Sequence, residues 1–360
     1  MGLGIAQVFA QAGRMVRATD ANAETRATAP ARLAATLAAR VAKGAMTEAE
    51  ENAILERLVI VDRVEDIPPA ALVIEAVVER LEVKQQVFSL LEQNLAPDAV
   101  LATNTSSLSV AAIAEGLRHP ERLVGLHFFN PAPVMRLVEL IPHAGTAPDA
   151  LTTARSLTES AGKTVIQCAD RPGFIVNRCA RPFYGEALAM LEEGRSPGEI
   201  DAAMMAAGYR LGPFALIDLI GADINLAATE GLSAAMGNHP RYHVFDALKA
   251  QVSSGHIGRK SLKGFMFPDD PPPPPEDAAA IALRIEATLV NEAAWLLAEG
   301  GSTAEGIDTA LKLGLNFPRG PFENLARHGR ATILQTLAEL EENAPSHLQT
   351  RYIPAPGLIP

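Results

Sequence analysis

The chain has 360 residues, which is enough for two or three domains of roughly 100–200 residues each. Its net charge of −11 at pH 7 disfavours a nucleic acid as a partner, and no run approaches the ~18 apolar residues of a membrane span. The two cysteines, Cys168 and Cys179, lack metal-ligand spacing, so we expect no metal site and a reduced, cytoplasmic compartment.

Strand-like and helix-like runs alternate over the first 170 residues. The strand candidates are 14–19, 58–62, 71–76, 100–104, 123–129, 136–141 and 164–168, and the clearest helical runs are 23–43 and 81–94. Alternation of this kind predicts a doubly wound parallel sheet of Rossmann type, covered by helices on both faces. We therefore assign residues 1–170 to an α/β dinucleotide-binding domain.

Strand signals vanish after Arg171, and apolar residues recur at helical spacing, so we expect the second half to be all-α. This half contains an internal repeat, because Glu186, Ile200-Asp201 and Gly212-Pro213-Phe214 recur as Glu292, Ile307-Asp308 and Gly320-Pro321-Phe322. We assign 171–267 to one helical domain, 268–277 to a proline-rich linker, 278–345 to a second, partial copy and 346–360 to a tail. The recurring Asp201 and Asp308 are expected to be structural.

The opening of the chain reads as a helix that begins at Gly2, followed by a strand that ends at Asp20. A carboxylate there accepts hydrogen bonds from the adenosine ribose and repels a 2′-phosphate, which favours NAD over NADP. The alternative is that Asp20 only caps the next helix. Gly2 can serve only as the third glycine of the fingerprint, because the first strand and the phosphate-binding turn do not precede it. We therefore expect that first strand to be missing and translation to begin upstream.

Polar residues are densest between residues 102 and 142. Asn104 to Ser107 follow a strand candidate, and the carboxyl ends of parallel strands are where such folds bind ligands. His127 and Glu139 lie in two successive apolar strand candidates, where an unpaired carboxylate is costly to bury. Adjacent strands would place Glu139 against one imidazole nitrogen and leave the other nitrogen as a general base. A purely structural histidine is the alternative.

Four segments together resemble the signature of the 3-hydroxyacyl-CoA dehydrogenase family. They are Asn-Thr-Ser-Ser at 104–107, His-Phe-Phe-Asn-Pro-Ala-Pro at 127–133, Leu-Val-Glu at 137–139 and Arg-Pro-Gly-Phe-Ile-Val-Asn-Arg at 171–178. The similarity covers nearly the whole chain, and the doubled helical part looks most like bacterial enzymes of fatty-acid β-oxidation and phenylacetate degradation. It implies NAD-dependent oxidation of an (S)-3-hydroxyacyl-CoA, 3-hydroxyadipyl-CoA among them, to the 3-ketoacyl-CoA.

The resemblance also implies roles for individual residues. His127 would remove the hydroxyl proton, and Glu139 would orient its imidazole. Ser106 and Asn177 would hydrogen-bond the substrate oxygen. Contacts to the NAD cofactor would come from Met1, Gly2, Asp20, Val77, Glu79, Lys84, Ser106 and Asn130. Simpler interpretations stay open, with Glu79 and Lys84 as solvated charges and Ser106 and Asn177 as helix caps.

Two other functions also stay open. Without its phosphate-binding turn the chain would bind NAD weakly, which is compatible with a catalytically impaired acyl-CoA-binding or scaffold protein. A dehydrogenase of another small hydroxy acid would share the same architecture. The second helical copy either replaces a dimer partner or covers the acyl cleft, so both a self-sufficient monomer and a homodimer remain open.

Overall fold

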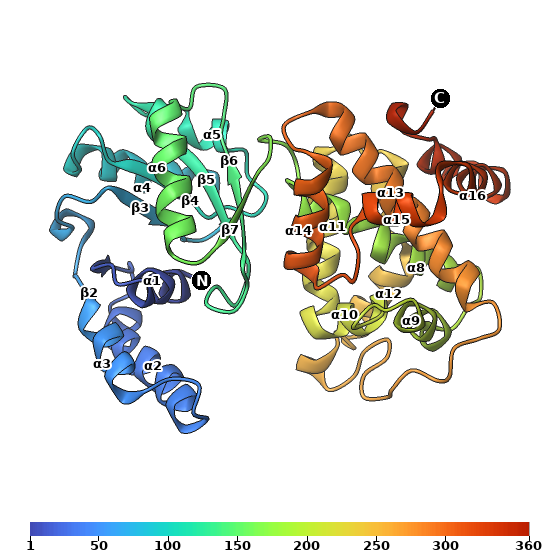
Figure 1. Cartoon of the computed structure of the whole chain (residues 1–360), viewed down its shortest axis with the longest axis horizontal. Coiled ribbons are helices and arrows are strands. Elements are labelled where there is room, and N and C mark those ends of the chain that lie inside the picture. Colours follow the sequence, from blue (N-terminus) through green and yellow to red (C-terminus); the bar gives the residue numbers. More distant parts are fainter. Residues whose placement is uncertain (360) are drawn as a thin grey trace. The chain divides into compact units, whose positions relative to one another are not determined.

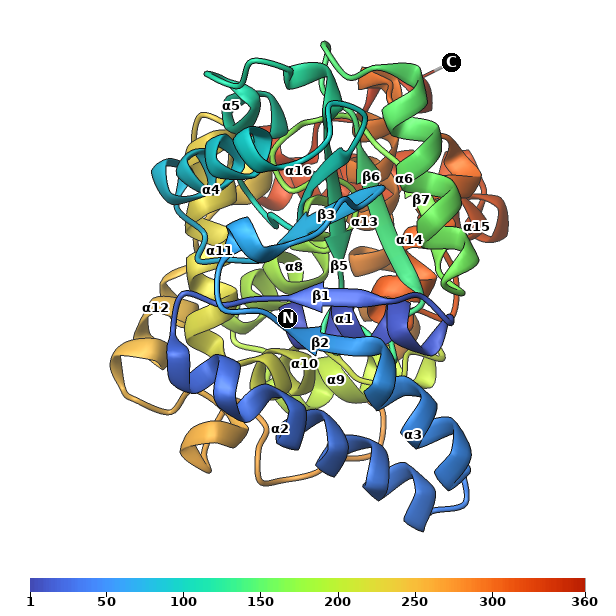
Figure 2. The ribbon, with the colours of Figure 1, turned by 90° about the vertical axis from the view of Figure 1, so that its left-hand side faces the viewer.

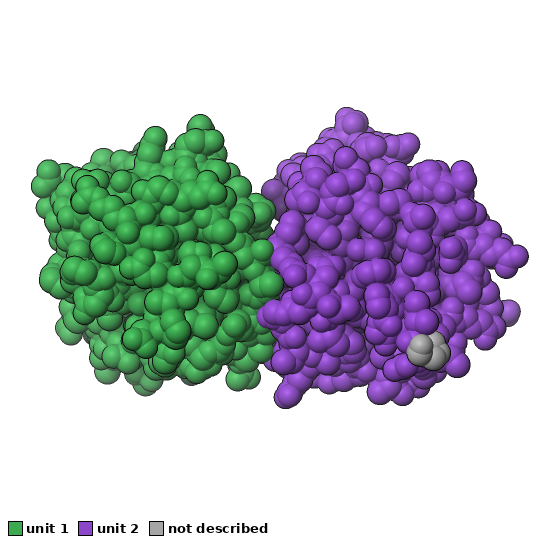
Figure 3. Space-filling model, turned by 90° about the horizontal axis from the view of Figure 1, so that it is seen from above, with its two compact units in different colours: residues 1–170 green, residues 171–360 purple. Residues whose placement is uncertain are grey.

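The computed structural model describes residues 1–359. The chain divides into two compact units, Met1–Asp170 and Arg171–Pro360, which Figure 3 distinguishes by colour, and Figure 1 shows the elements of each. The first unit combines strands and helices, whereas the second is helical. No helix within residues 1–359 is both long and apolar enough to cross a membrane.

The first unit alternates strands and helices as the sequence predicted. Its strands are β1 (Val16–Ala18), β2 (Leu58–Ile60), β3 (Leu72–Glu75), β4 (Val100–Thr103), β5 (Leu123–Phe128), β6 (Leu137–Ile141) and β7 (Thr164–Gln167). Its helices are α1 (Gly2–Gln11), α2 (Ala23–Ala42), α3 (Glu48–Arg57), α4 (Leu81–Asn94), α5 (Val110–Ala114) and α6 (Pro148–Ser160). Each strand lies inside one of the seven predicted runs, so the Rossmann-like α/β fold is confirmed.

The strands form two separate sheets (Figure 2). β1 pairs in parallel with β2, and a five-stranded sheet has the order β3-β4-β5-β6-β7. Strands β3, β4 and β5 are parallel, but β6 is antiparallel to β5, and β7 is parallel to β6. The sheet is therefore mainly rather than wholly parallel. The cause is the connection between β5 and β6, residues 129–136, which is too short for the crossover of a dozen or more residues that parallel strands need.

Helix α1 belongs to both apolar cores of the first unit. Ile5 and Val8 pack in a buried cluster with residues of β4, β5 and β6. Ala10, two residues after Val8, packs instead with Leu33 of α2 and Ile54 of α3. Helix α6 covers one face of the five-stranded sheet, and α4 and α5 pack together on the other (Figure 2). This packing fixes the beginning of α1 beside the strands that carry the candidate site.

The second unit consists of helices, as predicted. They are α7 (Val176–Cys179), α8 (Arg181–Glu192), α9 (Pro197–Ala206), α10 (Pro213–Ile220), α11 (Ala222–Ala235), α12 (Asp246–Ser253), α13 (Ala278–Glu299), α14 (Ala304–Leu315), α15 (Pro321–His328) and α16 (Arg330–Asn343). Two short 3-10 turns, η3 (Pro240–Tyr242) and η5 (Gln349–Tyr352), occupy equivalent places in the repeat. Helix α13 of the second copy packs against α8 and α9 of the first, so the two copies form one compact unit.

The recurring aspartates cap equivalent helices. Asp201 accepts hydrogen bonds from the backbone N–H groups of Phe214 (2.9 Å) and Ala215 (2.7 Å) at the start of α10. Asp308 accepts them from the N–H groups of Phe322 (2.8 Å) and Glu323 (3.1 Å) at the start of α15. The first N–H groups of a helix have no partner within it, so each carboxylate replaces the missing acceptors. Both aspartates are therefore structural, as the sequence suggested.

Removing either cap should destabilise the second unit. We expect Asp201→Ala and Asp308→Ala each to lower the free energy of unfolding by about 1–2 kcal/mol, the usual effect of losing a helix cap. Urea denaturation followed by circular dichroism measures this change. The control is Glu305→Ala, an exposed residue in the first turn of α14, which we expect to change stability by less than about 0.5 kcal/mol. A capping variant that unfolds like this control would contradict the structural role.

The two copies bind each other through reciprocal ion pairs. Arg178 of the first copy donates to Glu292 of the second over 2.7 Å, and Arg284 of the second copy donates to Glu186 of the first over 2.8 Å. Each arginine thus contacts the glutamate of the other copy rather than its own. Such reciprocity is the contact pattern of an isologous interface between two identical subunits, here formed within one chain.

Candidate active site

His127 and Glu139 face each other across two buried strands. They occupy directly opposite positions in the antiparallel pair β5–β6. Nδ1 of His127 lies 2.7 Å from Oε2 of Glu139, and the two residues are 6% and 0% exposed. The contact that the sequence predicted is present, because antiparallel pairing brings opposite side chains on one face within reach of each other.

This contact determines which imidazole nitrogen is basic. A carboxylate only accepts hydrogen bonds, so the proton of a neutral His127 is assigned to Nδ1 and the lone pair to Nε2. A buried carboxylate also stabilises the imidazolium that forms when Nε2 takes a proton. The pair therefore has the chemistry of a general base with an orienting acid, while its catalytic role stays a prediction.

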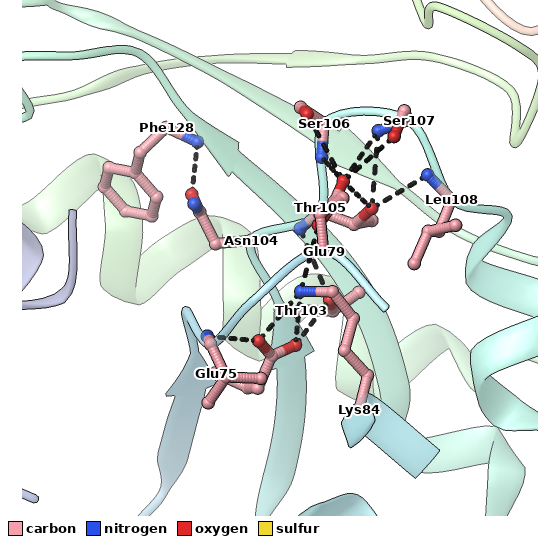
Figure 4. A network of polar contacts seen from close by, with 11 residues as sticks. Glu75, Glu79, Lys84, Thr103, Asn104, Thr105, Ser106, Ser107, Leu108 and Phe128 are labelled. Carbon is pink, nitrogen blue, oxygen red and sulfur yellow. Dashed lines mark hydrogen bonds and ion pairs between the residues drawn. The ribbon is translucent and has the colours of Figure 1, made fainter. Parts of the chain in front are cut away.

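Glu79 organises the loop that carries Ser106 (Figure 4). Its Oε1 accepts hydrogen bonds from the hydroxyl of Thr105 (2.7 Å) and from the backbone N–H of Ser106 (2.7 Å). The hydroxyl of Ser106 donates to the same oxygen over 3.2 Å, and the N–H and hydroxyl of Ser107 do so over 3.1 Å each. Burial alone raises the pKa of Glu79, but the bonds from Thr105 and Ser106 and the charge of Lys84 hold that pKa below its usual value. Glu79 is therefore more than a solvated charge.

Lys84 is buried and binds two carboxylates. Its Nζ donates to Glu75 at 2.8 and 3.1 Å and lies 3.2 Å from Glu79, and the side chain is 1% exposed (Figure 4). Glu75 also accepts hydrogen bonds from the hydroxyl of Thr103 and from the N–H of Val77. Lys84 thus holds Glu79 in place, and Glu79 in turn holds the Ser106 loop. A direct contact of Lys84 with the cofactor stays a prediction from the family resemblance.

Glu79→Gln should loosen this loop. We expect the free energy of unfolding at pH 7 to fall by about 1–2 kcal/mol, because a neutral amide forms weaker hydrogen bonds than a carboxylate and does not attract Lys84. The folded state lowers the pKa of Glu79 from its ordinary 4.5, so this stabilisation is present above pH 4.5 and is lost as the pH falls through the lowered pKa. The difference between wild type and variant should therefore shrink in acid.

Urea denaturation at pH 7 and at pH 3.5 measures both effects. The matched control is Glu82→Gln, an exposed glutamate in the first turn of the same helix α4, which we expect to be neutral at both pH values. Equal stabilities of Glu79→Gln and Glu82→Gln at pH 7 would refute the organising role of Glu79.

Other candidate cofactor residues lie near the ends of the first strands. Met1 precedes α1, Gly2 opens it, and a β carbon on Gly2 would lie 3.9 Å from the Cβ of Ala76, just after β3. Val77, the next residue, is 41% exposed. Among residues 1–359 no side chain caps the first turn of α1, and an uncapped helix N-terminus attracts a phosphate group. These features fit the pyrophosphate of a dinucleotide.

Asp20 and Asn130 are both exposed. Asp20 follows β1 and accepts a hydrogen bond from the N–H of Asn22 (2.8 Å), whereas the side chain of Asn22 itself caps α2. The alternative that Asp20 caps this helix is therefore wrong. Asn130 follows β5, and its peptide bond to Pro131 is cis. The cofactor contacts of Asp20 and Asn130 stay predictions.

Asn177 belongs to the second unit. It lies in the short helix α7, and the side chain of Arg181 donates a hydrogen bond from Nε to its backbone carbonyl over 3.0 Å. Its predicted contact with the substrate oxygen is an expectation from the family resemblance.

Three residues of the first unit have roles that the sequence did not indicate. Asn104 accepts a hydrogen bond from the N–H of Phe128 (2.9 Å) and so ties the end of β4, which leads to Ser106, to the end of β5 next to His127. Asp170 accepts hydrogen bonds from Ser109, Val110 and Ala111 at the start of α5. Glu75 is the buried partner of Lys84. The sequence indicates only that these three residues are polar, and it does not indicate the contacts that they form.

Two models of one protein family match the chain. Residues 1–171 match the family model described as 3-hydroxyacyl-CoA dehydrogenase, NAD binding domain. Residues 173–267 and 281–356 match the model described as 3-hydroxyacyl-CoA dehydrogenase, C-terminal domain.

Individual relatives carry related names. The chain is 43% identical over 263 residues to the 3-hydroxyadipyl-CoA dehydrogenase of Escherichia coli (strain K12), a match to 72% of this chain and to only 55% of that protein. It is 38% identical over 267 residues to a probable 3-hydroxybutyryl-CoA dehydrogenase of Bacillus subtilis (strain 168), covering 74% and 93% of the two chains. The crystal structure of a 3-hydroxybutyryl-CoA dehydrogenase from Escherichia coli K12 is similar with a TM-score of 0.91 and 32% identity, over 99% of this chain and 95% of that one. The chain thus belongs to the 3-hydroxyacyl-CoA dehydrogenase family of NAD-dependent oxidoreductases.

Proposed function

We propose that the chain oxidises an (S)-3-hydroxyacyl-CoA to the 3-ketoacyl-CoA with NAD. The observation that carries the proposal is the 2.7 Å contact between Nδ1 of His127 and Oε2 of the fully buried Glu139. It leaves Nε2 as the basic atom, next to the carboxyl end of β5 and on the side of the sheet where α/β folds bind their ligands.

Each group of the pair has a defined task in this reaction. Nε2 of His127 takes the proton of the 3-hydroxyl as the C3–H bond breaks and a carbonyl forms at C3. NAD, when bound, supplies the nicotinamide carbon that accepts the hydride. Glu139 stabilises the imidazolium until the proton leaves to solvent. The backbone N–H of Ser106 stays bound to Glu79, while its hydroxyl, which donates to Glu79 in this structure, would turn its proton to the substrate oxygen and so stabilise the charge that develops there.

The cofactor would lie along the ends of the first strands. The exposed carboxylate of Asp20 would accept the adenosine ribose hydroxyls and repel a 2′-phosphate, so NAD is preferred over NADP. The N-terminus of α1, at Met1 and Gly2, would face the pyrophosphate. Val77, Glu79, Lys84 and Asn130 would complete the contacts, with Lys84 acting through Glu79.

The test is NADH formation at 340 nm by the purified chain with 3-hydroxybutyryl-CoA and 3-hydroxyadipyl-CoA. We expect turnover with NAD and much slower turnover with NADP. Binding of both acyl-CoA substrates without NADH formation would favour the catalytically impaired acyl-CoA-binding protein instead. Turnover of free 3-hydroxy acids but not of their thioesters would favour a dehydrogenase of another small hydroxy acid.

A further inference from the structure

The two helical copies differ sharply at one equivalent place in the fold. Helix α8 corresponds to α13 through Glu186 and Glu292, and α11 corresponds to α16 through Gly221 and Gly329, which precede the two helices with positive φ. At the facing positions of α8 and α11 the first copy has Arg181, Tyr184, Asn225 and Thr229, whereas the second copy has Ala287, Val290, Ile333 and Leu337. The second set belongs to a single buried hydrophobic cluster. The first set is buried too, but it is polar.

Arg181 is the centre of the polar set. It is 8% exposed, its Nη1 donates to the hydroxyl of Thr229 over 2.9 Å, and its guanidinium lies 5.0 Å from the ring centre of Tyr184. No carboxylate within residues 1–359 forms an ion pair with it, unlike Arg178 and Arg284 in the same unit. Burial holds the pKa of Arg181 below its usual value, which is the effect expected of a buried cation without a counter-charge.

Further polar atoms near this arginine lack partners. Oδ1 of Asn225 is buried without a hydrogen bond, and so is Nη2 of Arg351, a residue that is 4% exposed. Arg351 and Arg181 both line a cavity of about 10 Å³, which is room for a group of the size of one water molecule or one carboxylate oxygen. Three arginines, Arg181, Arg241 and Arg351, therefore line a small cavity whose lining includes no acidic residue. Outside this lining Arg351 pairs with Glu186 and Arg241 pairs with Glu292, so among the described residues Arg181 is the arginine of this cavity without a carboxylate partner.

The second copy shows that the fold does not need this arrangement. Hydrocarbon side chains fill the equivalent place there, and burying an unpaired charge is far more costly than packing hydrocarbon. Packing thus gives no reason for a buried arginine in the first copy, whereas binding of an anion gives one.

We propose that Arg181 receives the terminal carboxylate of a dicarboxylyl-CoA substrate and so determines specificity for the acyl chain. The proposal rests on the proposed function and on the contact of Asn177 with the substrate oxygen that the family resemblance predicts. Arg181 lies four residues after Asn177, about one helical turn of 5.4 Å, and it donates to the carbonyl of Asn177. In a 3-hydroxyadipyl group the terminal carboxylate lies three carbons beyond the hydroxyl-bearing carbon. This distance is similar to the one helical turn that separates Asn177 from Arg181. A relative 43% identical to the chain is named for this substrate.

The test compares two substrates of equal length, 3-hydroxyadipyl-CoA and 3-hydroxyhexanoyl-CoA, which differ in the terminal carboxylate. The quantity measured is the ratio of their kcat/KM values, which does not depend on the fraction of folded enzyme. We expect wild type to prefer the adipyl substrate and Arg181→Met to lower the ratio by about 10–100-fold, the usual effect of losing a hydrogen bond to a charged group. Arg181→Lys, which keeps the charge, should restore part of the preference.

The matched control is Val290→Ala, in the apolar counterpart of the polar set. It disturbs the same unit at the position equivalent to Tyr184 and should leave the ratio within about twofold of wild type, because it lies outside the proposed carboxylate site. A wild type without preference for the adipyl substrate, or an Arg181→Met variant with an unchanged ratio, would overturn the proposal while the dehydrogenase function stands. A wild type that oxidises neither substrate would overturn the proposed function and this inference with it.

Discussion

His127→Asn is expected to lower kcat for 3-hydroxyacyl-CoA oxidation by about 10²–10⁴-fold, the usual contribution of a general base. Asparagine keeps an N–H donor near the position of Nδ1, so Glu139, which is 0% exposed, retains a hydrogen-bond partner. It lacks an atom equivalent to Nε2, so the variant removes the base while preserving the buried pair. NADH formation under saturating substrate measures kcat, and thermal unfolding checks that the fold is intact.

Glu139→Gln separates the two members of the pair. The glutamine amide can donate to Nδ1 of His127, which places the imidazole proton on Nε2, where the lone pair is needed. We therefore expect kcat to fall by about 10²-fold or more, as for other histidine bases that lose their orienting carboxylate.

The assignment of His127 as the base has a clear refutation. If kcat of the His127→Asn variant lies within tenfold of the wild-type value, another group takes the proton and the assignment is wrong.

The sequence predicts the His127–Glu139 contact for a physical reason. Both residues lie in apolar runs of strand length, and residues 129–136 between them allow only neighbouring strands. A buried carboxylate in such a run requires a partner, and His127 is the nearest titratable group on the adjacent strand. The same short connection also implies antiparallel pairing between β5 and β6, a detail that the prediction of a doubly wound parallel sheet did not include.

The Glu75–Lys84–Glu79 network was beyond sequence reasoning. Glu75 ends an apolar strand and Lys84 lies on an ordinary amphipathic helix, and nothing in their spacing of nine residues indicates that they meet. The contact depends on how α4 returns along the sheet after β3, which is set by tertiary packing rather than by local pattern. Sequence alone left Glu79 and Lys84 as possible solvated charges for that reason.

The ion pairs between the two helical copies also depend on tertiary packing and could not be predicted from the sequence. Equivalent glutamates at 186 and 292 are visible in the sequence as structural duplicates. Whether an arginine binds the glutamate of its own copy or of the other is a matter of three-dimensional arrangement, and both choices give the same sequence pattern. The structure selects the reciprocal arrangement, which makes the two copies mutually dependent.

Arg178→Met tests this dependence and should lower the free energy of unfolding by about 3–5 kcal/mol, the usual effect of breaking a buried ion pair from one side. Arg178 is 0% exposed and binds Glu292, which is 1% exposed, and both carboxylate oxygens of Glu299. Burial alone lowers the pKa of Arg178, but the hydrogen bonds and charges of Glu299 and Glu292 raise it above its usual value, so the guanidinium stays charged. Without the Arg178 guanidinium, the negative charge of the buried Glu292 is only partly neutralised.

The matched control is Arg171→Met, because Arg171 also binds Glu299 but is 37% exposed, so we expect a loss of less than about 1 kcal/mol. Removing both charges in Arg178→Met/Glu292→Met should recover part of the stability, since the penalty comes from an unpaired buried charge. Urea denaturation of the three variants measures these differences. If Arg178→Met and Arg171→Met unfold at the same urea concentration, the second copy is held by its apolar contacts alone, and the reciprocal ion pairs serve to set which surfaces of the two copies meet.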